Sequence, residues 1–186
     1  MTVCLGIDQS YSGLAMVAYN ASTGEHRDQL KSYPAERFRN QTDRLNTIRH
    51  DVSRNIMMFT RALGSIDVVA LEGYAPGSKY GRELAGELAA TIKLALYDNL
   101  LLPQCWPIVI APTKLKKYTT GRGTAAKNEM LLGVYKKWGV DYSDDNLADA
   151  YSLARAAHTW FEKAGTNSEL ETLKGLKRYS ADTHSP

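Results

Sequence analysis

Short apolar runs alternate along the chain with longer segments in which apolar side chains recur every three or four residues. Runs at 3–8, 13–19, 66–72 and 107–111 have the length and the bounding turn residues of buried strands, and 26–33 is a more polar candidate. Short polar turns join the first three runs. This spacing predicts an antiparallel meander at the start of the chain, followed by two further strands.

The segment 39–63 predicts a long amphipathic helix that ends before Gly64. Its apolar stripe consists of Leu45, Ile48, Val52, Ile56, Phe59 and Leu63. The charged residues that lie off this stripe are Arg44, Arg49, Asp51 and Arg54. We expect these four side chains to be solvated, because one face of such a helix packs on the core and the other meets water.

Four further helices are predicted in the second half of the chain. They cover residues 80–99, 112–118, 124–138 and 145–163. Thr124 is the expected N-cap of the third of these helices, and Ser143 or Asp144 that of the last. The last helix is apolar nearly all round, which predicts that it is buried.

The order of strands and helices predicts an α/β fold with a mixed β-sheet and helices on both faces. A chain of 186 residues suits one domain with a sizeable core. We assign residues 1–163 to this domain. The stretch 164–186 is polar and weakly patterned, so we expect a mobile tail with one helical turn near 170–176.

The chain has two cysteines and a small positive net charge. Cys4 and Cys105 have apolar neighbours, which is typical of buried thiols and favours a reducing, cytoplasmic setting. A net charge of +3 is too small to establish a nucleic-acid partner, so the distribution of charge matters more than its sum. We see no membrane-spanning run and no secretion signal.

Three acids occupy positions where burial makes an unpaired carboxylate costly. Asp8 and Glu72 each end an apolar strand, and Asp149 lies within the apolar last helix. Asp145 and Asn146 precede Asp149 by about one turn and can share a face with it. Carboxylates that converge in this way bind hard divalent cations, Mg²⁺ or Mn²⁺, and two such ions can promote phosphodiester hydrolysis.

Each of these acids also has an ordinary structural interpretation. Asp8 can cap its turn, Glu72 can end its strand at a loop, and Asp149 can pair with a distant Arg or Lys. Asp145 lies in the first turn of its helix, where the helix dipole favours acids. We favour the metal site because these interpretations would all have to hold at once.

Basic residues gather around a glycine-rich turn between the acidic strands and the acidic helix. They are Lys114, Lys116, Lys117, Arg122 and Lys127. Such a turn can contact phosphates through cations and backbone N–H groups, although a solvated lysine face has the same composition. Lys79 and Arg82 offer a second phosphate contact. Tyr74, on the loop after Glu72, can stack on a base or pack within the protein.

The chain resembles the RuvC-type Holliday junction resolvases over about residues 3–160, and their virus-like variants in particular. The motifs that carry the resemblance are Gly6-Ile-Asp8 with Gly13, Ala70-Leu-Glu72, Pro112-Thr-Lys with Thr120-Gly-Arg-Gly-Thr-Ala-Ala-Lys127, and Ala148-Asp149-Ala150. Each motif is short, but their order along the chain is that of the family.

The resemblance implies a ribonuclease H-like fold and a homodimer that cuts two strands of a four-way DNA junction with Mg²⁺, for which Mn²⁺ can substitute. It implies that Asp8, Glu72 and Asp149 are catalytic metal ligands, and that Lys127 and the loop before it contact the junction backbone. The family often has Asp or His three residues before the final acid, where this chain has Asn146. Either Asp145, which we favour, or the carbonyl oxygen of Asn146 completes the ligand set.

Three other functions compete with junction cleavage. The same acids can cut other branched DNA or structured RNA, or the chain can bind junctions without cutting them if Asn146 leaves the site one ligand short. An actin-like ATPase also begins with Gly-Ile-Asp, but this chain is too short for its two lobes. The small side chains of the helix 80–99 fit a homodimer contact and equally fit packing on the chain's own sheet.

Overall fold

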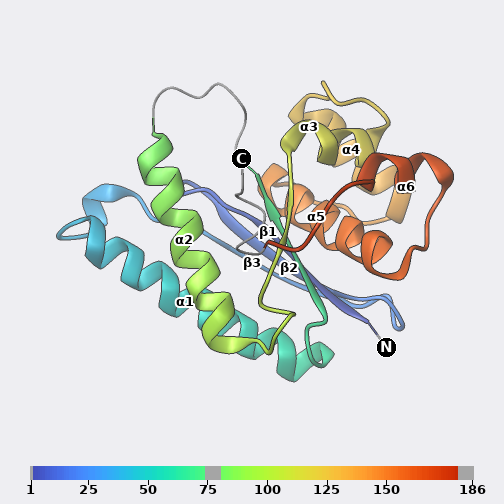
Figure 1. Ribbon diagram of the computed structural model, residues 1–186. Helices are drawn as coiled ribbons and strands as arrows, with labels where there is room; N and C mark the ends of the chain where they lie inside the picture. The colour runs from blue at the N-terminus through green and yellow to red at the C-terminus, as the bar shows by residue number, and fades with distance from the viewer. Residues whose placement is uncertain (1, 74–80, 180–186) are drawn as a thin grey trace.

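A computed structural model describes residues 2–73 and 81–179 of the chain (Figure 1). Its strands are β1 (Val3–Asp8), β2 (Leu14–Asn20), β3 (His26–Lys31), β4 (Val68–Glu72) and β5 (Ile108–Ile110). They form one sheet in the order β3-β2-β1-β4-β5. Pairing is antiparallel from β3 to β1 and parallel from β1 to β5, so the predicted meander and mixed sheet are confirmed.

Helices cover both faces of this sheet (Figure 1). They are α1 (Gln41–Leu63), α2 (Arg82–Asn99), α3 (Pro112–Thr120), α4 (Lys127–Trp138), α5 (Asp145–Glu162) and α6 (Asn167–Leu173), with a short 3-10 turn at Ala35–Arg37. The helices α1 and α2 pack on one face, and α3 to α6 lie on the other. The α/β fold class predicted from the sequence is therefore confirmed.

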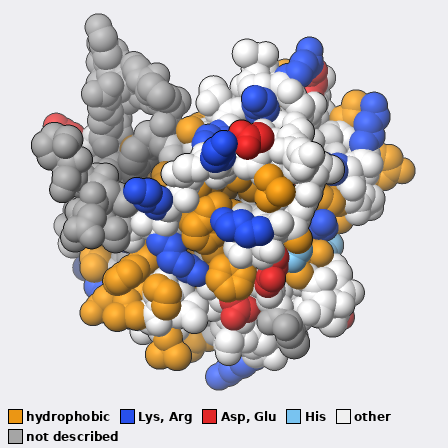
Figure 2. Space-filling model, turned by 45° about the vertical axis from the view of Figure 1, so that its right-hand side comes forward, with side chains coloured by type: hydrophobic (Ala, Val, Ile, Leu, Met, Phe, Trp, Pro, Cys, Tyr) orange, Lys and Arg blue, Asp and Glu red, His pale blue; other side chains and the backbone are white. Residues whose placement is uncertain are grey.

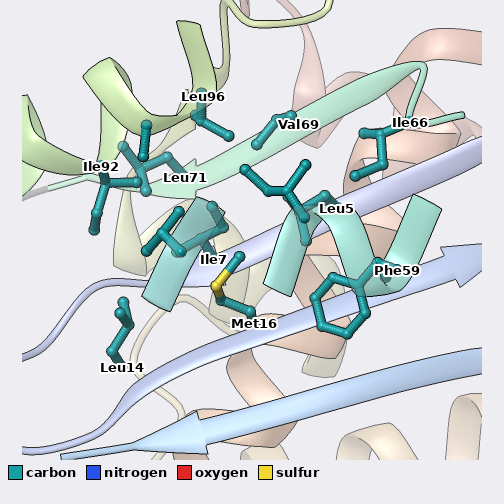
Figure 3. Packing of buried hydrophobic residues seen from close by; sticks show 14 of the residues in the cluster. Leu5, Ile7, Leu14, Met16, Phe59, Ile66, Val69, Leu71, Ile92 and Leu96 are labelled. Atoms are coloured by element: carbon teal, nitrogen blue, oxygen red, sulfur yellow. The ribbon is translucent and has the colours of Figure 1, made fainter. Parts of the chain in front are cut away.

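Alternate residues of β1 divide between two hydrophobic cores. Leu5 and Ile7 point toward α1 and α2, where Phe59 and Leu96 meet them (Figure 3). Cys4 points to the opposite face and packs in the core beneath α5. Because Asp8 follows Cys4 by four residues, the alternation directs its side chain to the α5 face.

The helix α5 lies directly against β1 at Gly6. A Cβ atom at this position would stand 2.0 Å from the backbone oxygen of Ala150 and 2.5 Å from the backbone nitrogen of Ala154. Only glycine permits this approach, because these neighbours are backbone atoms that cannot rotate away. The contact fixes the height of α5 above the ends of the central strands.

Two charged residues of α1 that we expected to be solvated are buried. The guanidinium of Arg44 lies 3.7 Å from the centre of the Tyr11 ring, and its Nε donates to the backbone oxygen of Tyr33 at 2.7 Å. Asp51 accepts hydrogen bonds from Lys31 Nζ at 2.6 Å and from the Tyr33 hydroxyl at 3.0 Å. The prediction from the periodicity of α1 was wrong for both residues, because their partners come from other elements of the fold.

The predicted N-cap of α4 is also wrong. The helix begins at Lys127, and Ala126 rather than Thr124 occupies the cap position. The N–H of Ala126 donates to the side chain of Glu129 at 2.7 Å, so the first turn is closed from inside the helix. Asp144, in contrast, caps α5 as one of the two predicted candidates, by accepting from the N–H of Asn146 at 2.9 Å.

The polar stretch near the carboxyl end packs on the protein as far as it is described. Glu169 of α6 forms an ion pair of 2.6 Å with Lys137 of α4. Arg178 forms an isolated bridge with Ile108, which adds a short covering segment at the edge of β5. The expected helical turn is thus a helix with fixed partners, and residues 180–186 lie outside the described range.

The two cysteines, Cys4 and Cys105, are buried and form no disulfide, as predicted. In the described part of the chain, no helix combines the length and the apolar character needed to cross a membrane.

Replacement of Gly6 by Ala tests the contact between α5 and β1. The added methyl group would overlap backbone atoms of α5, so Gly6→Ala should lower the free energy of unfolding by about 3 kcal/mol or more. Gly86→Ala is the matched control, because a Cβ atom there meets no atom of the described residues within 4 Å, and it should raise stability by about 0.5–1 kcal/mol. Urea denaturation measures both, and equal stability of the two variants would contradict the contact.

Candidate functional site

Two carboxyl groups leave the sheet side by side at its carboxyl-terminal edge. β1 and β4 run parallel with Ile7 opposite Leu71, so the next residues, Asp8 and Glu72, are neighbours on the α5 face. Asp8 is only 6% exposed, and its carboxyl group hydrogen-bonds that of Glu72. A hydrogen bond between two carboxyl groups requires that one of them carries a proton, and the raised pKa of Asp8 is consistent with this.

The first two turns of α5 bring further acids over these strand ends. Asp149 is half-buried, and its Oδ1 atom is shielded from solvent with no hydrogen-bond partner among the described residues. Asp145 lies one turn earlier, and its charge acts on both Asp8 and Asp149. The four predicted acids therefore belong to one electrostatic neighbourhood, built from the ends of β1 and β4 and the start of α5.

Burial and mutual repulsion make these carboxyl groups hard to ionise. Burial raises the pKa of Asp8 to about 8, with further increases from Glu72 and Asp145. Burial likewise raises the pKa of Asp149 to about 7, and the charges of Asp8 and Asp145 add to it. The pKa of Glu72 is raised by the same cause. Buried carboxyl groups with pKa values raised in this way are typical of functional sites, and a bound cation would offset their mutual repulsion.

Two of the predicted basic residues lie beside these acids. Lys127, at the start of α4, forms an ion pair with Asp145, and this partner raises the pKa of the lysine. Lys116 on α3 lies near Glu72 and Asp149, and its positive charge partly offsets the rise in their pKa values. The basic turn and the acidic cluster are therefore adjacent.

The remaining predicted basic residues face elsewhere. Lys114 donates to the backbone oxygen of Lys174 at 3.2 Å, and Arg122 forms an ion pair with Glu129. Lys117 is exposed on α3. Tyr74 and Lys79 lie outside the described residues, as does the side chain of Arg82, the first residue of α2. Their predicted contacts stay predictions.

The oxygen atoms of the site suit a hard divalent cation, although they are not gathered around one. Among residues 2–73 and 81–179, no three Asp, Glu, His or Cys side chains are arranged closely enough to enclose a metal ion. The Asp8–Glu72 proton and the Lys127–Asp145 ion pair engage oxygens that a cation would use. The unpartnered Oδ1 of Asp149 and the all-oxygen donor set fit Mg²⁺ or Mn²⁺.

The amide of Asn146 lies against the turn between β1 and β2. Its Nδ2 atom donates to Asp144 at 3.0 Å, and a Cβ atom at Gly13 would come within 2.8 Å of that nitrogen. This glycine therefore serves close packing of α5 on the turn. The charge of the neighbouring Asp145, in contrast, acts on both Asp8 and Asp149.

Sequence reasoning missed one residue of the site, Gln9. Its Nε2 atom donates to the backbone oxygen of Glu72 at 2.6 Å, which extends the contact between β1 and β4 beyond their last paired residues. Its Oε1 atom is buried and has no hydrogen-bond partner within residues 2–73 and 81–179. Its position directly after Asp8 was the available signal, since a polar residue at a buried strand end needs partners.

We compared the chain with known protein families, curated proteins and solved structures. No family model and no curated protein matches the chain. The structure of Thermus thermophilus RuvC superposes with a TM-score of 0.66 at 19% identity, covering 87% of this chain and 96% of that one. The structure of T. thermophilus RuvC in complex with a Holliday junction substrate superposes with a TM-score of 0.68 at 18% identity, covering 96% and 100%.

These likenesses show that the chain has a ribonuclease H-like α/β fold. The predicted resemblance to RuvC-type resolvases is confirmed at the level of this fold, over most of both chains.

The raised pKa values predict how the stability of the metal-free protein depends on pH. Folded Asp8 binds a proton up to about pH 8, whereas an unfolded aspartate loses it near pH 4, so stability falls as pH rises between these values. Asp8→Asn removes this loss, because an amide donates to Glu72 without ionising. At pH 8 in a chelator, the variant should be about 1–3 kcal/mol more stable than wild type.

Urea denaturation at pH 5 and pH 8 measures this difference, with Asp141→Asn, an exposed acid, as the control. Added Mg²⁺ or Mn²⁺ should raise the melting temperature of the wild type at pH 8 but not that of Asp8→Asn. An equal metal response of the two proteins would contradict a role for Asp8 in metal binding.

Proposed function

We propose that this protein is a structure-selective DNA endonuclease that hydrolyses phosphodiester bonds at four-way junctions by a two-metal-ion mechanism. The observation that supports this most directly is the convergence of Asp8, Glu72, Asp145 and Asp149 on one edge of a ribonuclease H-like sheet, with the Oδ1 atom of Asp149 buried and unpartnered. The likeness to a RuvC structure solved with a Holliday junction substrate supports the substrate class.

In this proposal, Asp8, Glu72 and Asp149 hold the metal ions, and Asp145 rather than Asn146 completes the set. Bound Mg²⁺ or Mn²⁺ would supply the Lewis acid that activates water and stabilises the leaving oxygen. Metal loading requires the proton shared by Asp8 and Glu72 to leave and Lys127 to release Asp145. The freed ammonium group of Lys127 is then available to a phosphate of the scissile strand.

Cations near the acids also explain how a polyanion could approach a negative site. Lys116 and Lys127 partly neutralise the carboxylates before metal binds. Lys114, Lys117 and Arg122 extend positive charge along α3 and the following turn, where we propose that they contact the DNA backbone. We also propose that Tyr74, Lys79 and Arg82, which follow Glu72 in the sequence, contact the DNA.

We further propose that the protein acts as a homodimer through α2. The helix exposes Ala90, Leu94 and Tyr97, and Leu101 follows at its end, which is the 4-3-4 spacing of a helix–helix seam. Leu94, Tyr97 and Leu101 are 52%, 63% and 83% exposed. Such large apolar side chains along one line are costly in water and typical of an interface. A dimer would place two active sites on the two strands of one junction.

Removal of a single carboxylate tests the catalytic proposal. Asp8→Asn should reduce Mg²⁺-dependent cleavage of a synthetic four-way junction by at least about 10²-fold, because the variant cannot hold the metal ions, while its junction affinity survives. Single-turnover cleavage and equilibrium binding in a chelator measure the two effects separately. Glu72→Gln and Asp149→Asn should behave alike, whereas Asp141→Asn should cut normally. Wild-type rates in Asp8→Asn would exclude the assignment.

The same assay separates the competing functions. Four-way, three-way, flap and linear duplex DNA, together with structured RNA, form the substrate panel. Equal cleavage rates on linear duplex and on the four-way junction would contradict junction selectivity. Faster cutting of another branched substrate would identify that substrate as the preferred one. Tight junction binding without cleavage in either Mg²⁺ or Mn²⁺ would instead favour a binding module.

The dimer is tested by placing a charge in the proposed seam. Leu94→Glu should raise the dimer dissociation constant at least about tenfold and shift the sedimentation coefficient toward that of a monomer, because the carboxylate would be buried against an apolar partner. Leu132→Glu, at a similarly exposed leucine of α4 on the other face of the sheet, should leave the dimer intact. A monomeric wild type at micromolar concentration would refute the proposal.

A further inference from the structure

A basic groove lies between the end of α3 and the length of α4. We call it the α3–α4 groove, and its polar lining consists of Thr119, Thr120, Arg122, Glu129, Lys136 and Lys137. A second hollow adjoins it, sharing Thr119 and Lys137 and adding Lys117 and hydroxyl groups of α6. Figure 2 turns the side of the molecule that carries α3 to α6 forward and shows Lys and Arg side chains spread over its upper part. The groove is separate from the acidic cluster.

Two of the cations in this groove are already committed to acids. Arg122 pairs with Glu129, and Lys137 pairs with Glu169 at 2.6 Å. These pairs hold the walls of the groove in place, because they tie the loop after α3 to α4 and α4 to α6. They add little to its net charge.

Two further cations, Lys136 in the groove and Lys117 in the adjoining hollow, are free to bind a ligand. Lys117 and Lys136 are exposed and form no ion pair within the described residues. Thr119 lines both hollows, and its buried hydroxyl group has no hydrogen-bond partner in the described part of the chain. Gly133 lets α4 approach this threonine, because a Cβ atom there would stand 3.3 Å from its methyl group. The groove therefore combines surplus positive charge with an unused hydrogen-bonding group.

The direction of α4 relates this groove to the acidic cluster. The helix begins at Lys127, whose ammonium group pairs with Asp145, and it runs away from the acids toward Lys136. Nine residues of α-helix span about 14 Å. One strand of duplex DNA advances about 3.4 Å per nucleotide along the helix axis, so 14 Å corresponds to about four nucleotides.

We propose that the α3–α4 groove binds a backbone phosphate of a junction arm about four nucleotides from the scissile phosphate, with Lys136 as its principal cation. This inference rests on the proposed function and adds a second anchoring point for the DNA. A phosphate is the ligand, so the contact is independent of base sequence and positions the arm rather than selecting it. The anchor limits the rotation of the arm about the active site.

Salt dependence of binding tests the contact. Binding is measured with Asp8→Asn as the background, in a chelator, so that no substrate is cut. Adding Lys136→Ala should weaken junction binding about 3–10-fold and reduce the slope of log affinity against log salt by about one, because one phosphate contact is lost. Lys136→Arg should restore both values, since it keeps the charge.

Lys177→Ala is the matched control for a lost surface charge. Lys177 is exposed and precedes Arg178, which pairs with the first residue of β5, at the end of the parallel strands opposite the acids. It should leave affinity and slope unchanged. If Lys136→Ala matches this control, the proposal is overturned.

Neutral phosphates locate the contact on the DNA. A methylphosphonate placed about four nucleotides from the cleavage point should weaken binding by the protein with Lys136, and should add no further loss to Lys136→Ala. Equal losses in both proteins at every position would refute the assignment. The readout does not involve cleavage, so this outcome is independent of the Asp8 activity test. If the wild-type protein cuts junctions but Lys136→Ala and Lys177→Ala bind them equally well, the proposed function stands and the proposed phosphate contact in the groove is wrong.

Discussion

The close approach of α5 to β1 at Gly6 is the contact on which the rest of the molecule depends. The absence of a side chain at this glycine lets the backbone of Ala150 and Ala154 rest on the central strand. That height brings Asp145 and Asp149 level with the ends of β1 and β4. The same contact makes α5 the helix that covers the core on this face of the sheet, because Ala150 and Ala154 are themselves buried there. One packing contact thus serves both the hydrophobic core and the acidic cluster.

The fold holds the acidic side chains close together although their negative charges repel one another. Asp8 and Asp149 have pKa values raised to about 8 and 7, so near neutral pH the folded protein retains protons that an unfolded chain would release. Lys116 and Lys127 reduce this repulsion without removing it. The surrounding cores must supply the free energy that the cluster costs, which is the usual compromise between stability and function at active sites. A divalent cation would offset the repulsion among the carboxylates and so would stabilise the folded state.

Much of this architecture was predictable because it follows from local pattern. The strands, the cap at Asp144 and the anomaly of Asp149 among apolar neighbours are properties of short stretches, and each was found in that way. Arg44 looked solvated because its partners, the Tyr11 ring and a backbone oxygen near β3, are distant in sequence. Lys136 drew no attention for a similar reason, since only the packing of α4 on α3 makes a groove beside it. The tertiary contacts of individual polar side chains could therefore not be predicted from the sequence.

The two outer strands have a consequence for assembly. The edge beyond β5 is covered by the chain itself, where Arg178 bridges Ile108 and the N–H of Tyr179 donates to the backbone oxygen of Pro107 at 2.7 Å. The opposite edge, β3, is polar and largely exposed, with charged side chains that disfavour the addition of another strand. Neither edge therefore invites β-augmentation or edge-to-edge aggregation. Copies of this protein that associate would therefore have to meet through helices, in assemblies of limited size rather than as a growing sheet.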